Sequence, residues 1–222
     1  MCVWLLDLSL NDDFLQRWLV LLKPLSASDK DKQEVYNTLR SHYAESHRAY
    51  HTFEHIKACL HHLDNVVTNV DNAFYLELAL WFHDVIYDPK STTNERDSAL
   101  YASDILQALG LSQQASTQVN HLILLTQHPS NPQTFDEQIL IDIDLSILGA
   151  ESSGFAIYEK NIRQEYCWVD EKTYRSERAK VLASFLVQPR IYQTDYFFTA
   201  SEQRARKNID QLLETLSQHT DP

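Results

Sequence analysis

The segment from Ala73 to His83 constrains the fold more than any other part of the chain. It reads Ala-Phe-Tyr-Leu-Glu-Leu-Ala-Leu-Trp-Phe-His and is apolar around nearly the whole circumference of a helix. Such a helix has no polar face to turn toward water, so it belongs at the centre of a core, with other elements around it. Asp84 follows directly, and Asp88-Pro89 then breaks the helical pattern.

Much of the remaining chain carries the 3–4 apolar spacing of amphipathic helices; in residues 30–44, for example, Val35, Leu39 and Tyr43 share one face. Further helices are predicted over residues 54–67, 94–109 (before Gly110), 113–127, 137–148, 154–169, 172–187 and 201–217, with a long loop from His128 to Phe135. Only three Gly and six Pro occur in 222 residues, which disfavours turn-rich all-β folds. We expect one all-α domain over residues 1–222, a helical bundle with its core at about 30–187 and the C-terminal helix, 201–217, packed on it.

The charge balance limits the partners of the chain. There are 31 acidic and 19 basic residues, which gives a formal net charge of −12. Broad nucleic-acid binding normally needs a basic face, so we do not expect it. An acidic protein can still bind a small phosphorylated substrate where a bound metal ion supplies the positive charge.

The three cysteines, Cys2, Cys59 and Cys167, are far apart and form neither a metal-type pair nor a disulfide pattern, which favours a reducing compartment. The first residues lack the basic start of a signal peptide. No apolar run approaches the roughly 20 residues that span a bilayer. We therefore expect a cytoplasmic protein without a membrane partner.

Three segments carry side chains of the kinds that bind metals. They are Tyr50-His51-Thr52-Phe53-Glu54-His55, Trp81-Phe82-His83-Asp84 and Ile141-Asp142-Ile143-Asp144. The second is the most informative, because it ends the most apolar helix and an unpaired buried carboxylate costs several kcal/mol. A divalent cation or a structural ion pair could supply the partner, and the ordered combination of His, His-Asp and Asp favours the cation.

The order His55, His83-Asp84, Asp144 resembles the motif of the HD superfamily of metal-dependent phosphohydrolases. More narrowly, six blocks between about residues 48 and 210 resemble a bacterial family of predicted HD phosphohydrolases: Tyr50-His51-x-x-His55, Trp81 to Asp88, Asn94-Glu95-x-x-Ser98-Ala99, Asp144 to Gly149, Ile162-Arg163-x-Glu165-Tyr166 and Ala205-Arg206-x-Asn208. The first block is also similar to that of cyclic-nucleotide phosphodiesterases, where Asn stands in place of Thr52. Nothing else resembles their substrate pocket.

The resemblance implies that His55, His83, Asp84 and Asp144 hold a divalent metal ion (Mn, Fe, Co, Ni, Zn or Mg) and that a metal-activated water attacks a phosphomonoester or phosphodiester, with nucleotides among the candidates. Asp84 is thereby both ligand and catalytic residue. Asp142 remains an alternative to Asp144. By position in the motif, His51 is a candidate general acid, or else a residue that only hydrogen-bonds a ligand.

Further candidates come from the helices around this motif. Glu95 could orient water or hold substrate, although an acidic residue in a first helical turn also complements the helix dipole. Arg163 and Lys160, spaced by three on one helix, and His128, just before Pro129, are candidate contacts to the phosphate. Arg163 could equally pair with a nearby glutamate.

Two other functions fit part of the pattern. A non-catalytic HD domain could sense a nucleotide through the same residues. His51-x-x-Glu54-His55 also fits the inverted zinc-peptidase motif, which would leave His83-Asp84 and Asp144 unexplained. Neither the substrate, nor the identity and number of metal ions, nor the oligomeric state can be read from the sequence.

Overall fold

The computed structural model describes residues 13–127 and 131–217; the regular secondary structure in these ranges is helical, with no β-strand in them. The α-helices are α1 (Asp13–Leu21), α2 (Asp29–His42), α3 (Phe53–Val66), α4 (Ala73–Phe82), α5 (Asn94–Ala108), α6 (Gln113–Leu125), α7 (Phe135–Asp144), α8 (Ser152–Glu165), α9 (Glu171–Leu186) and α10 (Asp195–Ser217). Two short 3₁₀ helices, η1 (Val67–Asn69) and η2 (Leu145–Gly149), follow α3 and α7. The predicted all-α class is confirmed.

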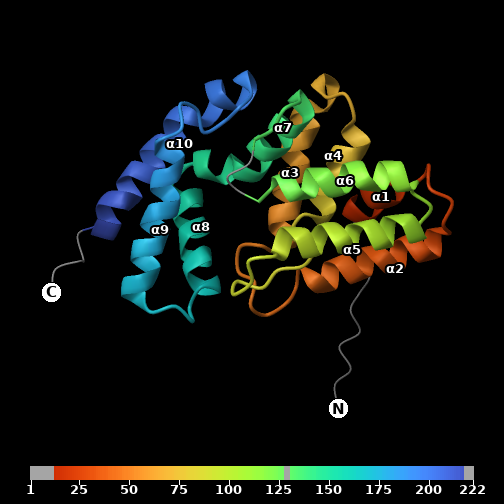
Figure 1. The fold of residues 1–222 in the computed structure, drawn as a ribbon, viewed down its shortest axis with the longest axis horizontal. Coiled ribbons are helices and arrows are strands. Elements are labelled where there is room, and N and C mark those ends of the chain that lie inside the picture. The colour runs from red at the N-terminus through yellow and green to blue at the C-terminus, as the bar shows by residue number, and fades with distance from the viewer. Residues whose placement is uncertain (1–12, 128–130, 218–222) are drawn as a thin grey trace, which may run out of the picture.

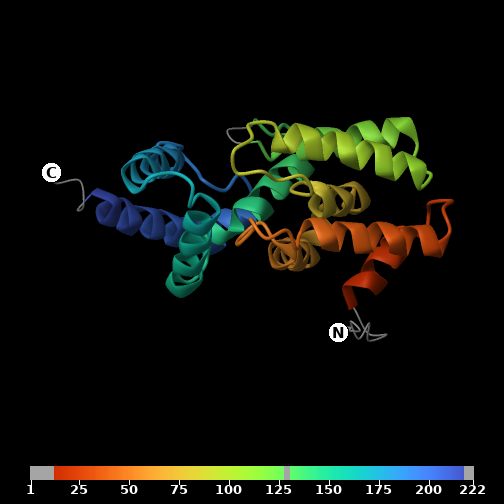
Figure 2. The ribbon, with the colours of Figure 1, turned by 90° about the horizontal axis from the view of Figure 1, so that it is seen from below.

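The helices form two neighbouring groups. Helices α1 to α7 lie together on one side, and α8, α9 and α10 lie on the other, as the two views show (Figure 1 and Figure 2). In the first group α4 contacts α3, α5, α6 and α7; in the second, α10 contacts α9. The short helix η2 contacts α7, α8 and α10, so it joins the two groups.

Helix α4 lies at the centre of the first group, as its sequence predicts. Every residue from Leu78 to Phe82 is fully buried, so this helix has no solvent-facing side along that stretch. The ring of Trp81 contacts those of Trp18, Tyr36 and Phe53, with centroids 5.3, 6.0 and 5.8 Å apart. Three surrounding helices, α1, α2 and α3, therefore pack against α4 through aromatic side chains.

Helix α1 was not predicted, and three helix boundaries differ from those predicted by four residues or more. Helix α10 begins at Asp195 rather than at 201, α8 ends at Glu165 rather than at 169, and the helical geometry of α7 changes at Leu145 from α to 3₁₀. The earlier start of α10 has a tertiary cause. The buried carboxylate of Asp142 accepts hydrogen bonds from the backbone N–H and the hydroxyl of Thr194, at 2.8 and 2.6 Å, and so holds the residue that precedes the helix. A contact between residues 52 positions apart cannot be seen in a local apolar pattern.

Gly110 ends α5 where the sequence predicts a terminal glycine, and its φ of +102° is one that side chains disfavour. A Cβ atom there would lie 2.3 Å from Oγ and 3.0 Å from the backbone N of Ser26. We expect Gly110→Ala to lower the free energy of unfolding by about 2 kcal/mol, through backbone strain and overpacking. Urea denaturation measures this change.

Gly154→Ala is the matched control for that substitution. Gly154 lies inside α8, and the nearest atom to its added Cβ would be 3.5 Å away, an ordinary contact. Alanine should therefore stabilise the protein there by about 0.5–1 kcal/mol. Equal effects of the two substitutions would contradict the role given to Gly110.

None of the helices in the described ranges combines the length and the apolar character that a membrane crossing requires.

Candidate metal centre

The ends of three helices bring four predicted ligands together. His55 lies in the first turn of α3, Asp144 is the last residue of α7, and His83 and Asp84 follow the last turn of α4. Since α4 contacts both α3 and α7, the three ends lie side by side. The buried apolar side chains of α4 thus place a His-Asp pair at the edge of the core.

The four side chains converge on one point. The Nε2 atoms of His55 and His83 are 3.1 Å apart. Asp84 Oδ2 lies 3.1 Å from Nε2 of His83 and 3.6 Å from that of His55. Asp144 Oδ1 lies 3.4 Å from Nε2 of His55 and 3.5 Å from that of His83. Atoms bound at about 2.0–2.2 Å to one cation lie roughly 2.8–3.6 Å from each other in octahedral or tetrahedral geometry, so these spacings fit a shared metal ion.

The protonation of His83 explains why a cation fits there. Its Nδ1 lies 3.0 Å from the carbonyl oxygen of Leu80 and donates its proton to it, which leaves a lone pair on Nε2. That lone pair faces the carboxylate oxygens of Asp84 and Asp144. Three acceptors so close together repel one another unless a proton or a metal ion lies among them.

The pKa values of His83 and Asp84 are shifted by the charges that these side chains place close together. Burial alone lowers the pKa of His83, but the charges of Asp84 and Asp144 outweigh it and raise that pKa well above its usual value. Burial alone raises the pKa of Asp84, but His83 and its other histidine neighbours hold it far below the usual value. The site is thus built to bind positive charge, which a proton supplies when no metal ion does.

Cys59 offers a second ligand set with the two histidines. Its Sγ lies 3.7 Å from Nε2 of His55, and one ligand atom each of His55, Cys59 and His83 fall within 4.8 Å of one another. Burial raises the pKa of this thiol, and the charges of Asp144 and Asp84 raise it further, so it stays protonated. Because the pKa of Asp84 is held low and an oxygen of each aspartate lies within 3.6 Å of both histidines, we favour the carboxylates as ligands.

Asp142 and Asp144 have separate roles in the structure. The carboxylate of Asp142 accepts the N–H of Gln193 at 2.7 Å as well as the two groups of Thr194. Burial raises its pKa to about 6 despite these hydrogen bonds. Since its oxygens are committed to the start of α10, Asp144 is the carboxylate from this helix that reaches the two histidines.

Glu165, at the end of α8, holds the segment that carries His51. Its Oε1 accepts the backbone N–H groups of Ala49, Tyr50 and His51 at 2.7, 2.7 and 2.9 Å. Its Oε2 lies 2.7 Å from Nδ1 of His51 and accepts the hydroxyl of Tyr87 at 2.8 Å. One buried carboxylate therefore fixes both the backbone and the ring of the candidate acid.

These contacts set the charges of the pair. Burial raises the pKa of Glu165, but its hydrogen bonds with His51 and the backbone lower it to about 2 overall. Burial lowers the pKa of His51, but the hydrogen bond with Glu165 and the charge of Asp84 raise it above its usual value. His51 is thus an oriented imidazole that is readily protonated, which is what a general acid requires.

Arg48, like Glu165, has a role that the sequence does not reveal. Its buried guanidinium donates to the carbonyl oxygens of His51, Asp84 and Val85 at 3.0, 2.7 and 2.9 Å. It also pairs with Glu45 at 3.0 Å. The segment with the candidate acid is thereby tied to the turn with a candidate ligand.

Glu95 lies in the first turn of α5 and is half-buried. Burial raises the pKa of Tyr166, and the nearby charge of Glu95 contributes to that shift. Tyr166 in turn shares a hydrogen bond with Tyr87, the tyrosine that contacts Glu165. Glu95 is therefore near the residues that support His51, and no contact places it among the four converging ligands.

Of the predicted phosphate contacts, Arg163 and Lys160 make no contact with the four candidate ligands. Arg163 donates to the carbonyl oxygens of Tyr166 and Val169 at 2.7 and 3.1 Å and pairs with Glu171 at 3.0 Å, so it closes the end of α8. Lys160 is exposed on the same helix. His128 lies outside the described residues.

The inverted peptidase motif lacks its essential geometry. Its glutamate, Glu54, has a side chain that is 78% exposed and pairs with Lys57 at 2.7 Å. The ring of His51 turns its Nδ1 toward Glu165, while His55 meets His83. The motif therefore does not gather two histidines and a glutamate at one point.

Comparison of the chain with protein-family models, with curated proteins and with solved structures gives no match. What this site does must therefore be inferred from its own residues.

Proposed function

We propose that this chain is a metal-dependent phosphohydrolase that binds its metal ion through His55, His83, Asp84 and Asp144. The observation that carries the proposal is the convergence of their four ligand atoms, each imidazole Nε2 lying within 3.6 Å of both carboxylates. Two imidazoles and two carboxylates suit a divalent first-row transition metal. The resemblance of the motif order to the HD superfamily supports phosphoester hydrolysis as the reaction.

In that reaction the chain has three tasks. A bound divalent cation would polarise a phosphoryl oxygen and lower the pKa of water toward roughly 7. The four ligands would hold that cation. As the oxygen of water bonds to phosphorus and its proton passes to solvent, the bond from phosphorus to the leaving oxygen breaks. His51 gives its proton to that leaving oxygen, and Glu165 keeps the imidazole oriented and charged.

Elemental analysis of the purified protein, together with a panel of phosphate esters assayed with each candidate metal, tests the proposal. We expect at least one equivalent of a divalent metal per chain and hydrolysis of at least one ester. A chelator should abolish the activity and the same metal should restore it. Metal binding without turnover of any ester would favour a sensor domain instead, and cleavage of peptides would favour a peptidase.

A further inference from the structure

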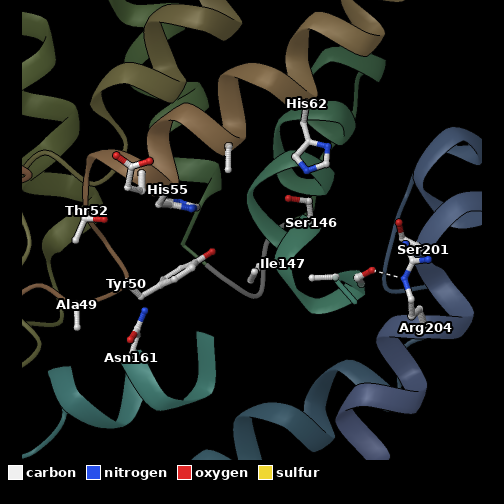
Figure 3. Close-up of a pocket in the computed structure, with 14 residues that line it drawn as sticks. Ala49, Tyr50, Thr52, His55, His62, Ser146, Ile147, Asn161, Ser201 and Arg204 are labelled. Carbon is white, nitrogen blue, oxygen red and sulfur yellow. Dashed lines mark hydrogen bonds between the residues drawn. The ribbon is translucent and has the colours of Figure 1, made fainter. Parts of the chain in front are cut away.

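A cavity of about 470 Å³ opens beside His55. Its walls come from the start of α3, from η2, from α8 and from α10, so both helix groups contribute to it. His55 lies at one end, Ser201 and Arg204 lie at the other, and the side chain of Tyr50 projects between them (Figure 3). Cavities of about 300–1,000 Å³ hold small ligands. Because His55 belongs both to the wall of the cavity and to the candidate metal centre, the cavity adjoins that centre.

The walls carry several uncommitted polar side chains. Six lining residues are half-buried and have side chains without a hydrogen-bond partner within residues 13–127 and 131–217: Tyr50, Thr52, His62, Ser146, Asn161 and Ser201. They supply four hydroxyls, one imidazole and one carboxamide, and so both donate and accept. Water satisfies such groups in the free protein, and a ligand that displaces it must offer hydrogen bonds in return.

The charges of the walls disfavour a second anionic group. Among the described residues that line the cavity, Arg204 is the only one with an arginine or lysine side chain. Its Nε donates to the carbonyl oxygen of Gly149 at 2.7 Å, and its Nη1 pairs with Glu151 at 3.1 Å. Glu54 adds a negative charge to the same lining. These charges favour a neutral group in the cavity over the second phosphate of a bisphosphate or of a nucleoside diphosphate.

The rings of the walls disfavour a flat base. The described residues of the lining include three aromatic rings, those of Tyr50, His55 and His62. That of Tyr50 already contacts the rings of His51, His55 and Tyr158, with centroids 5.0, 4.9 and 4.6 Å away. That of His62 contacts Phe197 at 5.7 Å. The ring of His55 contacts that of His83 at 5.2 Å. Recognition of a nucleobase usually uses open ring faces on which the base stacks, and these three rings already contact other rings.

We propose that this cavity binds the organic part of the substrate and that this part is a neutral, hydroxylated, non-aromatic group. The substrate is then the phosphate monoester of a sugar or polyol. This inference rests on the proposed phosphohydrolase activity and adds the substrate class to it.

Steady-state kinetics of the full chain with its metal tests the substrate class. The probes are glucose 6-phosphate and sorbitol 6-phosphate, against uridine and adenosine monophosphates and fructose 1,6-bisphosphate. We expect kcat/KM for glucose 6-phosphate and sorbitol 6-phosphate to exceed that for the two nucleotides and the bisphosphate by about 10-fold or more. One or two well-placed hydrogen bonds account for a difference of this size.

Asn161→Leu tests the cavity itself, because leucine has a similar size and makes no hydrogen bonds. It should raise KM for glucose 6-phosphate by about 5- to 10-fold and leave the metal content unchanged. It should also reduce the increase in melting temperature that glucose 6-phosphate produces in the metal-free protein. Gln164→Leu, an exposed position on the same helix outside the cavity, is the control and should change none of these quantities. Ser201→Ala is a second variant in case the leucine disturbs folding.

The outcomes separate the two proposals. A preference for nucleotides or for the bisphosphate, or equal effects of Asn161→Leu and Gln164→Leu, would overturn the assignment of the cavity while the phosphohydrolase proposal stands. Bound metal without turnover of any ester would overturn the phosphohydrolase proposal itself.

Discussion

Asp84→Ala should remove the bound metal ion and reduce phosphoester hydrolysis below detection. The carboxylate of Asp84 lies 3.1 and 3.6 Å from the Nε2 atoms of the two histidines, so its loss removes both a ligand and a negative charge. Loss of residues that merely support a ligand weakens metal binding by about 10- to 100-fold, and loss of a ligand should weaken it further. Elemental analysis after dialysis and a phosphatase assay measure the two effects.

Asp104→Ala is the matched control, because Asp104 is an exposed aspartate on α5. Its metal content and activity should equal those of the unaltered protein. Asp84→Asn keeps the shape of the side chain and should also lose metal, which guards against a folding defect in the alanine variant. Unchanged metal content in both Asp84 variants, checked by circular dichroism to be folded, would refute the ligand assignment.

Glu165→Gln should lower kcat by about 100-fold while the metal content stays the same. The amide cannot stabilise a charged His51, so the proton needed by the leaving group is lost, and general acid catalysis contributes about 10²- to 10⁴-fold. An alkyl phosphate should suffer most, because an alkoxide leaves poorly. Hydrolysis of p-nitrophenyl phosphate should fall much less, since its leaving group departs without a proton.

The pH dependence of kcat provides an independent test of how Glu165 affects the pKa of His51. The pKa of His51 is raised, so the acid form is present at low pH and is lost as the pH rises through that value. Without the carboxylate the pKa of His51 falls, and the high-pH limb of the kcat profile should move to lower pH. The pKa of Glu165 is about 2, so this carboxylate stays ionised across the assay range. Glu177→Gln, an exposed position on α9, should leave the profile unchanged.

Equal losses for the alkyl and the nitrophenyl ester, with an unmoved pH limb, would show that Glu165 is only a structural anchor for residues 49–51. Loss of metal in the Glu165→Gln variant would show the same.

The sequence predicted well the features that depend on local periodicity. Burial of α4 follows from its own composition, since a helix that is apolar all round can be stable only inside a core. His55, His83, Asp84 and Asp144 lie together because the helices that carry them end near one another. The order of these residues in the sequence, which resembles the HD motif, predicts that they lie together. Their binding of a metal ion stays a prediction.

Contacts between distant segments were beyond the reach of the sequence. Asp142 and Asp144 are two residues apart on one helix and so point in different directions. Only the hydrogen bonds from Gln193 and Thr194 reveal which of them serves the fold. Glu165 meets His51 across 114 positions of the chain, and no local spacing indicates such a pairing. Arg48 likewise binds carbonyl groups 36 and 37 positions away.

The contact between Glu165 of α8 and residues 49–51 has a consequence for the order in which parts of the site form during synthesis. All four candidate ligands lie between His55 and Asp144, so a nascent chain carries the whole metal-binding set once α7 has been made. Glu165 ends the following helix and is synthesised later. Under the proposed function, metal capture can therefore precede the alignment of the proton donor His51, which requires that α8 has docked.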